Sequence, residues 1–159
     1  MIKLKKFKLL LSLAIISLVL GLGKAALASD IIVNDLNGQA VNISSYQDKP
    51  VILFFWTTWC PYCRVELKKL NQGYAQMAKE GIVVLGVNVS EPEYKVRRFF
   101  KGYLLNFRML LDKYGLLADK YSLLGVPTYI FLDKAGKVIS QAQRLPENYK
   151  NLLFRQVIK

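Results

Sequence analysis

Histidine is absent from this chain of 159 residues, and cysteine occurs twice, at Cys60 and Cys63. A structural zinc site commonly takes four Cys or His ligands, and a copper site of the mixed thiolate type also needs imidazole. This ligand shortage argues against both metals, and we expect neither a metal ion nor another cofactor. Two cysteines are also too few for the set of spaced disulfides that stabilises many small secreted domains.

Acidic residues are scarce as well, because 11 Asp and Glu stand against 23 Lys and Arg, which gives a formal net charge of +12. The chain still has the composition of a globular protein, since 53% of its residues are apolar and 21% are charged. It shows no internal repeat and no low-complexity tract. Its length suits one domain with a substantial core.

Part of the positive charge lies in residues 1–28, which differ in kind from the rest. Four lysines lie within the first eight residues, an uncharged run of 14 residues follows over 9–22, and Ala26-Leu27-Ala28 comes last. This is the pattern of a secretory signal peptide, and the run is shorter than the roughly 20 residues that span a bilayer. We expect cleavage after Ala28 and one domain over residues 29–159. The alternative is a retained N-terminal membrane anchor; a buried core helix is disfavoured by the lysines at its entry.

Cleavage at that point would remove five basic residues and no acidic residue, which lowers the formal net charge from +12 to +7. The remaining basic residues are spread out and form no concentrated stripe, so we expect no nucleic-acid partner. The charge favours at most an anionic membrane face. Export predicts an extracytoplasmic location, the periplasm or an equivalent compartment, where disulfides can form and persist.

Periodicity and turn residues predict alternating strands and helices after the leader. Asn37-Gly38 indicates a hairpin, and the unbroken apolar run 51–56 indicates a strand buried on both faces. Pro61 suits the first turn of a helix, and Ser90 to Glu93 has the pattern of a capping box that opens another. The fold class is therefore α/β, a mixed central β-sheet flanked by helices. The expected hairpin arms are 31–33 and 39–43, the other strands are 51–56, 82–89, 107–111, 129–132 and 137–143, and the helices are 61–79, 90–103, 113–124 and 146–158.

The two cysteines follow a strand and open a helix, and this position separates the possible roles of the pair. A structural disulfide across four residues would stabilise the fold by about 2 kcal/mol in the loop-entropy model, against roughly 4.7 kcal/mol for a 100-residue loop. A redox role fits better, because a helix N-terminus stabilises a thiolate at Cys60 and lowers its pKa. Cys63 lies one helical turn further on and can close the disulfide.

The residues around this pair resemble the thioredoxin superfamily. Its active-site motif is similar to Trp59-Cys60-Pro61-Tyr62-Cys63, and its cis-proline loop is similar to Gly125-Val126-Pro127-Thr128. The wider pattern over residues 31–158, including 49–56, 64–67 and 131–138, resembles the TlpA/ResA-like branch. The resemblance implies a thioredoxin fold with an N-terminal β-hairpin and an inserted helix, for which 90–103 is the candidate.

The resemblance also implies an activity. Proteins of this branch are exported, often membrane-anchored thiol–disulfide oxidoreductases. Here Cys60 would attack a disulfide in an extracytoplasmic protein, apocytochrome c being one such substrate, and Cys63 would resolve the mixed disulfide. A membrane thiol electron donor would restore the dithiol, and we expect a monomer.

Other site residues are carried over from the same resemblance. Pro127 would follow a cis peptide bond, and the backbone of Val126 would pair with an extended substrate segment. Trp59, Pro61 and Tyr62 would form the surface that a substrate contacts.

Two further positions concern proton transfer. The buried acid of the familiar thioredoxins is replaced here by Phe54. Glu66 is expected to influence the proton transfers of the cysteines instead, although a solvated acid in the first turn of the helix is the alternative.

Two other functions remain open at this stage. The same chemistry in the opposite direction would make an oxidase that introduces disulfides, since direction depends on the reduction potential relative to the compartment. A non-catalytic module could instead hold extended polypeptides in the groove beside Val126 and Pro127.

Overall fold

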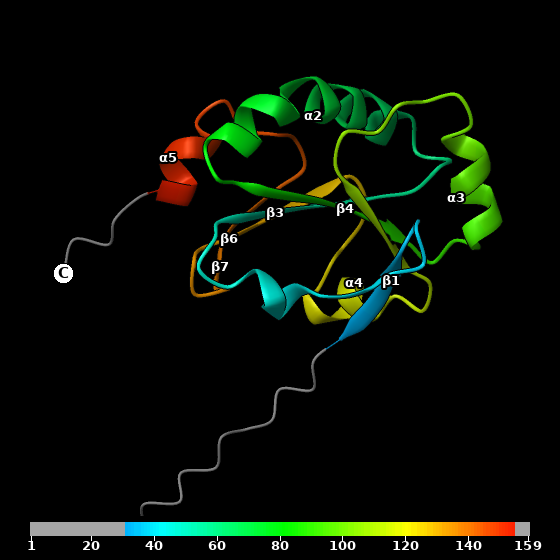
Figure 1. The fold of residues 1–159 in the computed structure, drawn as a ribbon, viewed down its shortest axis with the longest axis horizontal. Helices are drawn as coiled ribbons and strands as arrows, with labels where there is room; N and C mark the ends of the chain where they lie inside the picture. Colours follow the sequence, from blue (N-terminus) through cyan, green and yellow to red (C-terminus); the bar gives the residue numbers. More distant parts are fainter. Residues whose placement is uncertain (1–30, 155–159) are drawn as a thin grey trace, which may run out of the picture.

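The computed structural model describes residues 31–154, whose seven strands form one sheet in the order β2-β1-β5-β4-β3-β6-β7 (Figure 1). The predicted leader and the end of the predicted last helix lie outside the described residues. β3 pairs in parallel with β4 and antiparallel with β6, so the sheet is mixed, as predicted. The strands are β1 (Ile32–Asp35), β2 (Ala40–Asn42), β3 (Val51–Trp56), β4 (Val83–Val89), β5 (Arg108–Asp112), β6 (Thr128–Leu132) and β7 (Val138–Ala142).

Helices cover both faces of this sheet. The helix α2 lies along one face, with α3 and α5 on the same side, whereas α4 and the short η1 lie on the other (Figure 1). Among residues 31–154, none of these helices is both long enough and apolar enough to cross a bilayer. The helices are η1 (Ile43–Tyr46), α2 (Pro61–Lys79), α3 (Glu93–Phe99), α4 (Leu116–Lys120) and α5 (Tyr149–Phe154).

The strand that leads to the cysteines is buried along its whole length. Ile52, Phe54 and Trp56 pack under α2, α3 and α5, while Leu53 and Phe55 pack under α4. Successive side chains of a strand point to opposite faces, so a strand covered on both faces must be apolar at every position. This double burial gives the end of β3 a fixed position, from which the cysteine loop departs.

Two predicted helices are shorter than the sequence pattern indicated, and the predicted last helix begins at Tyr149 and not at Pro146. The predicted capping box is wrong: α3 begins at Glu93, its N-cap is Pro92, and no side chain caps it. Ser90 adopts a left-handed conformation with φ 53°, and Glu91 turns away to bond a distant loop. The predicted helix over 113–124 contracts to α4 because Gly115, at φ 72°, sits at its N-cap. The helix α3 still lies between β4 and β5, where the inserted helix was expected.

Candidate redox site

Cys60 occupies the N-cap of α2 and forms a disulfide with Cys63, one turn into the helix. Pro61 fills the first helical position, where its missing N–H leaves no bond unmade. The Cys63 N–H donates to Cys60 Sγ across 3.1 Å. The Cys60 N–H donates back to the carbonyl of Thr57 at 3.4 Å, which closes a turn between β3 and α2. The sulfur of Cys60 therefore lies where the first free N–H groups of the helix point.

Solvent reaches the two cysteines unequally. Cys63 is fully buried, whereas Cys60 retains 4% of its surface. Cys60 Sγ lies 3.9 Å from the carbonyl oxygen of Val126, in the loop before β6. The Val126–Pro127 peptide bond is cis, which confirms the expectation for Pro127. The cis-proline loop and the cysteines thus meet although 66 residues separate Cys60 from Val126.

A groove of about 400 Å³ runs beside this contact. Its walls come from the first turns of α2, the cis-proline loop and the segment after β7. Trp59 and Tyr62 flank the cysteines with 68% and 73% of their surfaces exposed. Large exposed aromatic side chains beside a groove are typical of a surface that contacts a partner. The residues that line the groove are Tyr62, Val65, Glu66, Lys69, Val126, Pro127, Gln143 and Arg144.

Glu66 is not the solvated acid of the alternative interpretation, because only 4% of its surface is exposed. Its Oε2 accepts hydrogen bonds from the Tyr129 hydroxyl at 3.2 Å and the Leu145 N–H at 3.0 Å. Its Oε1 accepts from Lys69 Nζ at 3.0 Å. Burial acts to raise the pKa of Glu66, but these three donors outweigh it and hold that pKa below its ordinary value. Glu66 is therefore ionised at neutral pH.

Phe54 and Tyr129 form the layer beneath this carboxylate. Phe54 is fully buried, pairs with Tyr129 across β3 and β6, and their rings lie 4.8 Å apart. Burial, together with the charge of Glu66 and the hydrogen bond to it, raises the pKa of Tyr129. Tyr129 thus stays a neutral donor. Phe54 therefore provides no acid on β3, and the buried acid next to it is Glu66 of α2.

Two side chains that the sequence analysis did not single out hold the loop before Cys60. The Glu91 carboxylate accepts hydrogen bonds from the N–H and the hydroxyl of Thr58, both at 2.6 Å. Arg64 donates from Nε and an Nη to the carbonyl of Thr58, at 3.2 and 2.8 Å. Glu91 lies 33 residues from Thr58, so no local pattern indicates the pair. Within residues 31–154, no group of three or more His, Cys, Asp or Glu side chains could hold a metal ion.

The sheet, the helix order and the disulfide at the start of α2 define a thioredoxin-fold protein with a two-cysteine site. The chain belongs to the AhpC/TSA family, whose model matches residues 24–141.

Relatives and solved structures agree with this assignment. The chain is 32% identical over 114 residues to the thiol-disulfide oxidoreductase ResA of Bacillus thuringiensis subsp. konkukian (strain 97-27), covering 72% of this chain and 66% of that protein. It is 30% identical over 131 residues to ResA of Bacillus subtilis (strain 168), covering 79% and 73%. The chain thus spans just under two thirds of the former relative. The resemblance to the ResA-like branch is confirmed.

A solved structure shows the same fold. The pneumococcal exposed lipoprotein thioredoxin Etrx1 from Streptococcus pneumoniae strain TIGR4 superposes with a TM-score of 0.68 at 28% identity. The match covers 78% of this chain and 98% of that one. The thioredoxin fold expected from the cysteine motif and the cis-proline loop is therefore confirmed.

Proposed function

We propose that this protein is an exported thiol–disulfide oxidoreductase that reduces disulfides in extracytoplasmic proteins. The observation that carries the proposal is the position of Cys60. Its sulfur sits at the N-terminus of α2, accepts the N–H of Cys63, and borders the groove at Val126. A helix N-terminus favours a thiolate, which is both the attacking and the leaving species in disulfide exchange.

The reduction proceeds by two exchanges. The Cys60 thiolate attacks one sulfur of the substrate disulfide, so that a Cys60–substrate bond forms, the substrate disulfide breaks, and its second sulfur leaves as a thiolate. Cys63 then loses its proton and attacks Cys60 Sγ, which re-forms the Cys60–Cys63 disulfide and releases the first substrate sulfur. Two electrons pass from the dithiol to the substrate, whose two thiolates take up protons.

Glu66 serves the second exchange in this proposal. It lies one helical turn beyond Cys63 and is ionised, so it can receive the proton that Cys63 loses. Its three donors hold the carboxylate in the wall of the groove. Lys69, which is bonded to Glu66 and exposed, connects this position with solvent.

The substrate lies in the groove as an extended segment. The backbone of Val126 pairs with it as an edge strand would, while Trp59, Pro61 and Tyr62 contact its side chains. The shape of the groove suits a protein disulfide better than a small compact ligand, because its aromatic rim is open to solvent. Apocytochrome c belongs to this class of substrate, and a membrane thiol donor would return the protein to its dithiol form.

Export rests on the leader pattern of residues 1–28, with an extracytoplasmic domain over 29–159. A relative described as an exposed lipoprotein supports the same location. Whether the leader is cleaved is tested by N-terminal sequencing of the exported protein. A start at Ser29 supports cleavage, and a retained Met1 supports an anchor.

Turnover of a protein disulfide tests the activity. With dithiothreitol as electron source and insulin as substrate, the protein should accelerate disulfide reduction, and Cys60→Ser should abolish the acceleration. A parent protein that gives no acceleration, but binds an extended polypeptide equally well with and without Cys60→Ser, would indicate a binding module. The reduction potential tests direction: a value near that of thioredoxin, about −270 mV, supports a reductase, whereas one near about −120 mV indicates an oxidase.

A further inference from the structure

We propose that Glu91 is a positioning residue for Cys60, because it fixes the turn that presents the cysteine at the N-terminus of α2. The proposal rests on the function proposed above, in which Cys60 is the attacking thiolate. Within residues 31–154, Glu91 makes no hydrogen bond to either sulfur; its partners are Thr58 and Asn88. It acts through Thr58, in the middle of the short segment between β3 and Cys60.

Every polar group of Thr58 is engaged by a charged side chain. Glu91 Oε2 accepts the backbone N–H at 2.6 Å, and Glu91 Oε1 accepts the hydroxyl at 2.6 Å. Arg64 donates twice to the carbonyl from the other side. Hydrogen bonds to ionised groups are the short, strong class, and paired bonds also fix orientation. The loop that precedes Cys60 is therefore held at Thr58, whose N–H and hydroxyl bond Glu91 and whose carbonyl bonds Arg64.

Glu91 is itself held in place, which is what a positioning residue needs. It is buried, and its Oε2 also accepts from Asn88 Nδ2 at 2.7 Å. Asn88 is a buried residue of β4 that pairs with Trp56 at the end of β3. The Glu91 carboxylate thus connects β4, in the middle of the sheet, to the loop that carries Cys60.

The same arrangement explains why the chain departs from a regular helix start at this point. A capping box would have used residues 90–93 to open α3. Instead α3 begins uncapped at Glu93, and Ser90 takes a left-handed conformation. These features direct the Glu91 carboxylate toward Thr58. The segment inserted between β4 and β5 therefore supplies a contact to the cysteine loop.

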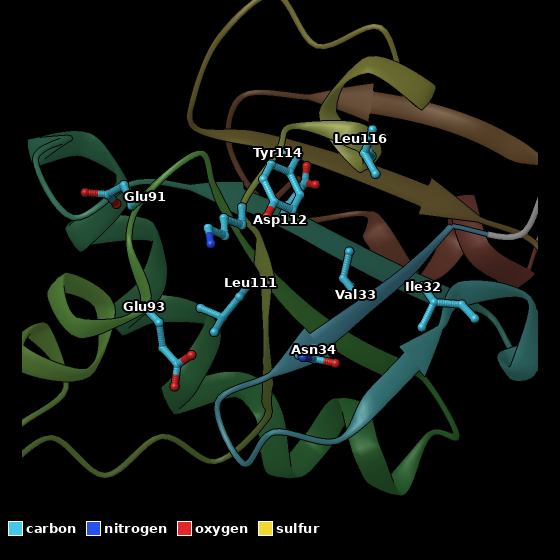
Figure 2. A pocket seen from close by; sticks show the side chains of 10 residues that line it. Ile32, Val33, Asn34, Glu91, Glu93, Leu111, Asp112, Tyr114 and Leu116 are labelled. Atoms are coloured by element: carbon cyan, nitrogen blue, oxygen red, sulfur yellow. The ribbon is translucent and has the colours of Figure 1, made fainter.

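A cavity of about 340 Å³ beside Glu91 does not offer a competing role for this carboxylate (Figure 2). Its acidic side chains are engaged within the protein. Asp112 accepts two backbone N–H groups of α4, and Glu93 pairs with Arg97 at 2.6 Å. Figure 2 shows Glu91 at one end of the cavity, apart from Asp112 and Tyr114. The contacts of Glu91 are with Thr58 and Asn88.

The pH dependence of Cys60 alkylation tests the proposal. In a reduced Cys63→Ser background, iodoacetamide reports Cys60 alone. Glu91→Ala removes both bonds to Thr58, so the loosened turn should hold Cys60 less well at the helix N-terminus. The pH midpoint of alkylation should rise by about one unit, which is about tenfold less thiolate at a pH below both midpoints. Glu93→Ala, on the same segment but exposed, should leave the midpoint unchanged.

The conservative variant separates position from charge. Glu91→Gln keeps the shape and can still bond both polar groups of Thr58, because the amide can donate to the hydroxyl oxygen. Positioning predicts that Glu91→Gln returns the midpoint close to the parent value. If Glu91 instead acted by its charge, Gln and Ala would shift the midpoint alike and downward, which overturns the proposal. If Glu91→Ala does not fold, Thr58→Val takes its place, and an unchanged midpoint there also overturns it.

Failure of this proposal is distinguishable from failure of the proposed function. Alkylation needs no substrate and no electron donor, so the comparison among variants stands whatever the protein reduces. If the parent reduced no protein disulfide while the midpoints behaved as described, the function would fail and the positioning role would remain. If the parent were active and Glu91→Ala kept its midpoint, the positioning role alone would fail.

Discussion

The hydrogen bond from Tyr129 to Glu66 gives a prediction that can be worked through from the structure. The Tyr129 hydroxyl is one of three donors to a buried carboxylate, at 3.2 Å from Oε2. A hydrogen bond to a charged group contributes about 1.5–3 kcal/mol to folding, and this one is longer than the usual O–H···O⁻ distance. We therefore expect Tyr129→Phe to lower the free energy of unfolding at pH 7 by about 1.5 kcal/mol. For a chain of this length that is a fall in Tm of about 3–6 °C.

The pH dependence of this loss identifies its cause. Burial opposes ionisation of Glu66, but its donors lower the pKa below the ordinary 4.5, so the group stabilises the fold fully above that value. The stabilisation disappears as the pH falls through the lowered pKa. The variant lacks one donor, so its Glu66 pKa should move back up. The difference between variant and wild type should therefore shrink from pH 7 toward pH 3.5.

Urea denaturation of the oxidised protein, followed by tryptophan fluorescence, measures both quantities. Tyr114→Phe is the matched control, because Tyr114 is exposed and should be replaceable without effect. A difference for Tyr129→Phe that is as large at pH 3.5 as at pH 7 would refute the reasoning. It would show that the substitution acts through packing and not through the charged hydrogen bond.

Three further predictions concern the site. Glu66→Gln should leave the alkylation rate of Cys60 within about twofold. It should slow release of the mixed disulfide, measured by quenched-flow and mass spectrometry, by about tenfold or more, because general-base catalysis typically contributes at least about that much. Equal release rates for the variant and the wild type would contradict the role of Glu66 in proton transfer. Trp59→Ala should reduce kcat/KM for a protein disulfide about 5- to 30-fold, yet leave reduction of a small aromatic disulfide nearly unchanged, because the exposed ring contacts a polypeptide. Phe54→Ala should lower the free energy of unfolding by about 3–5 kcal/mol in urea titration, since it empties a fully buried site against Tyr129; a loss under about 1 kcal/mol would mean that the site collapses around the smaller side chain.

The elements next to the cysteines could be predicted to the residue because their signals are local. The apolar run of β3 ends in a short loop, Pro61 opens α2, and a turn at Gly81 follows its end, so Val51–Trp56 and Pro61–Lys79 have the predicted bounds. The cis-proline contact was predicted from resemblance, because no local pattern indicates that Val126 lies beside Cys60.

The contacts that support the site could not be predicted in this way. Glu66 meets Tyr129 and Leu145, which lie 63 and 79 residues further along the chain. The predicted capping box over 90–93 gave Glu91 no role, yet its carboxylate bonds Thr58, which follows the neighbouring strand β3. Long-range hydrogen bonds by a buried carboxylate overrode the local signal, since a buried charge without partners costs far more than an uncapped helix end.

Trapping of the mixed disulfide tests the central claim most directly. The reduced Cys63→Ser variant, mixed with an oxidised substrate protein, should accumulate a covalent adduct that tandem mass spectrometry locates on Cys60. Reduced Cys60→Ser should form little adduct, because Cys63 is fully buried. Adduct on Cys63 in the second variant at the rate of the first, or no adduct in either, would contradict the assignment of Cys60 as the attacking residue and Cys63 as the resolving one.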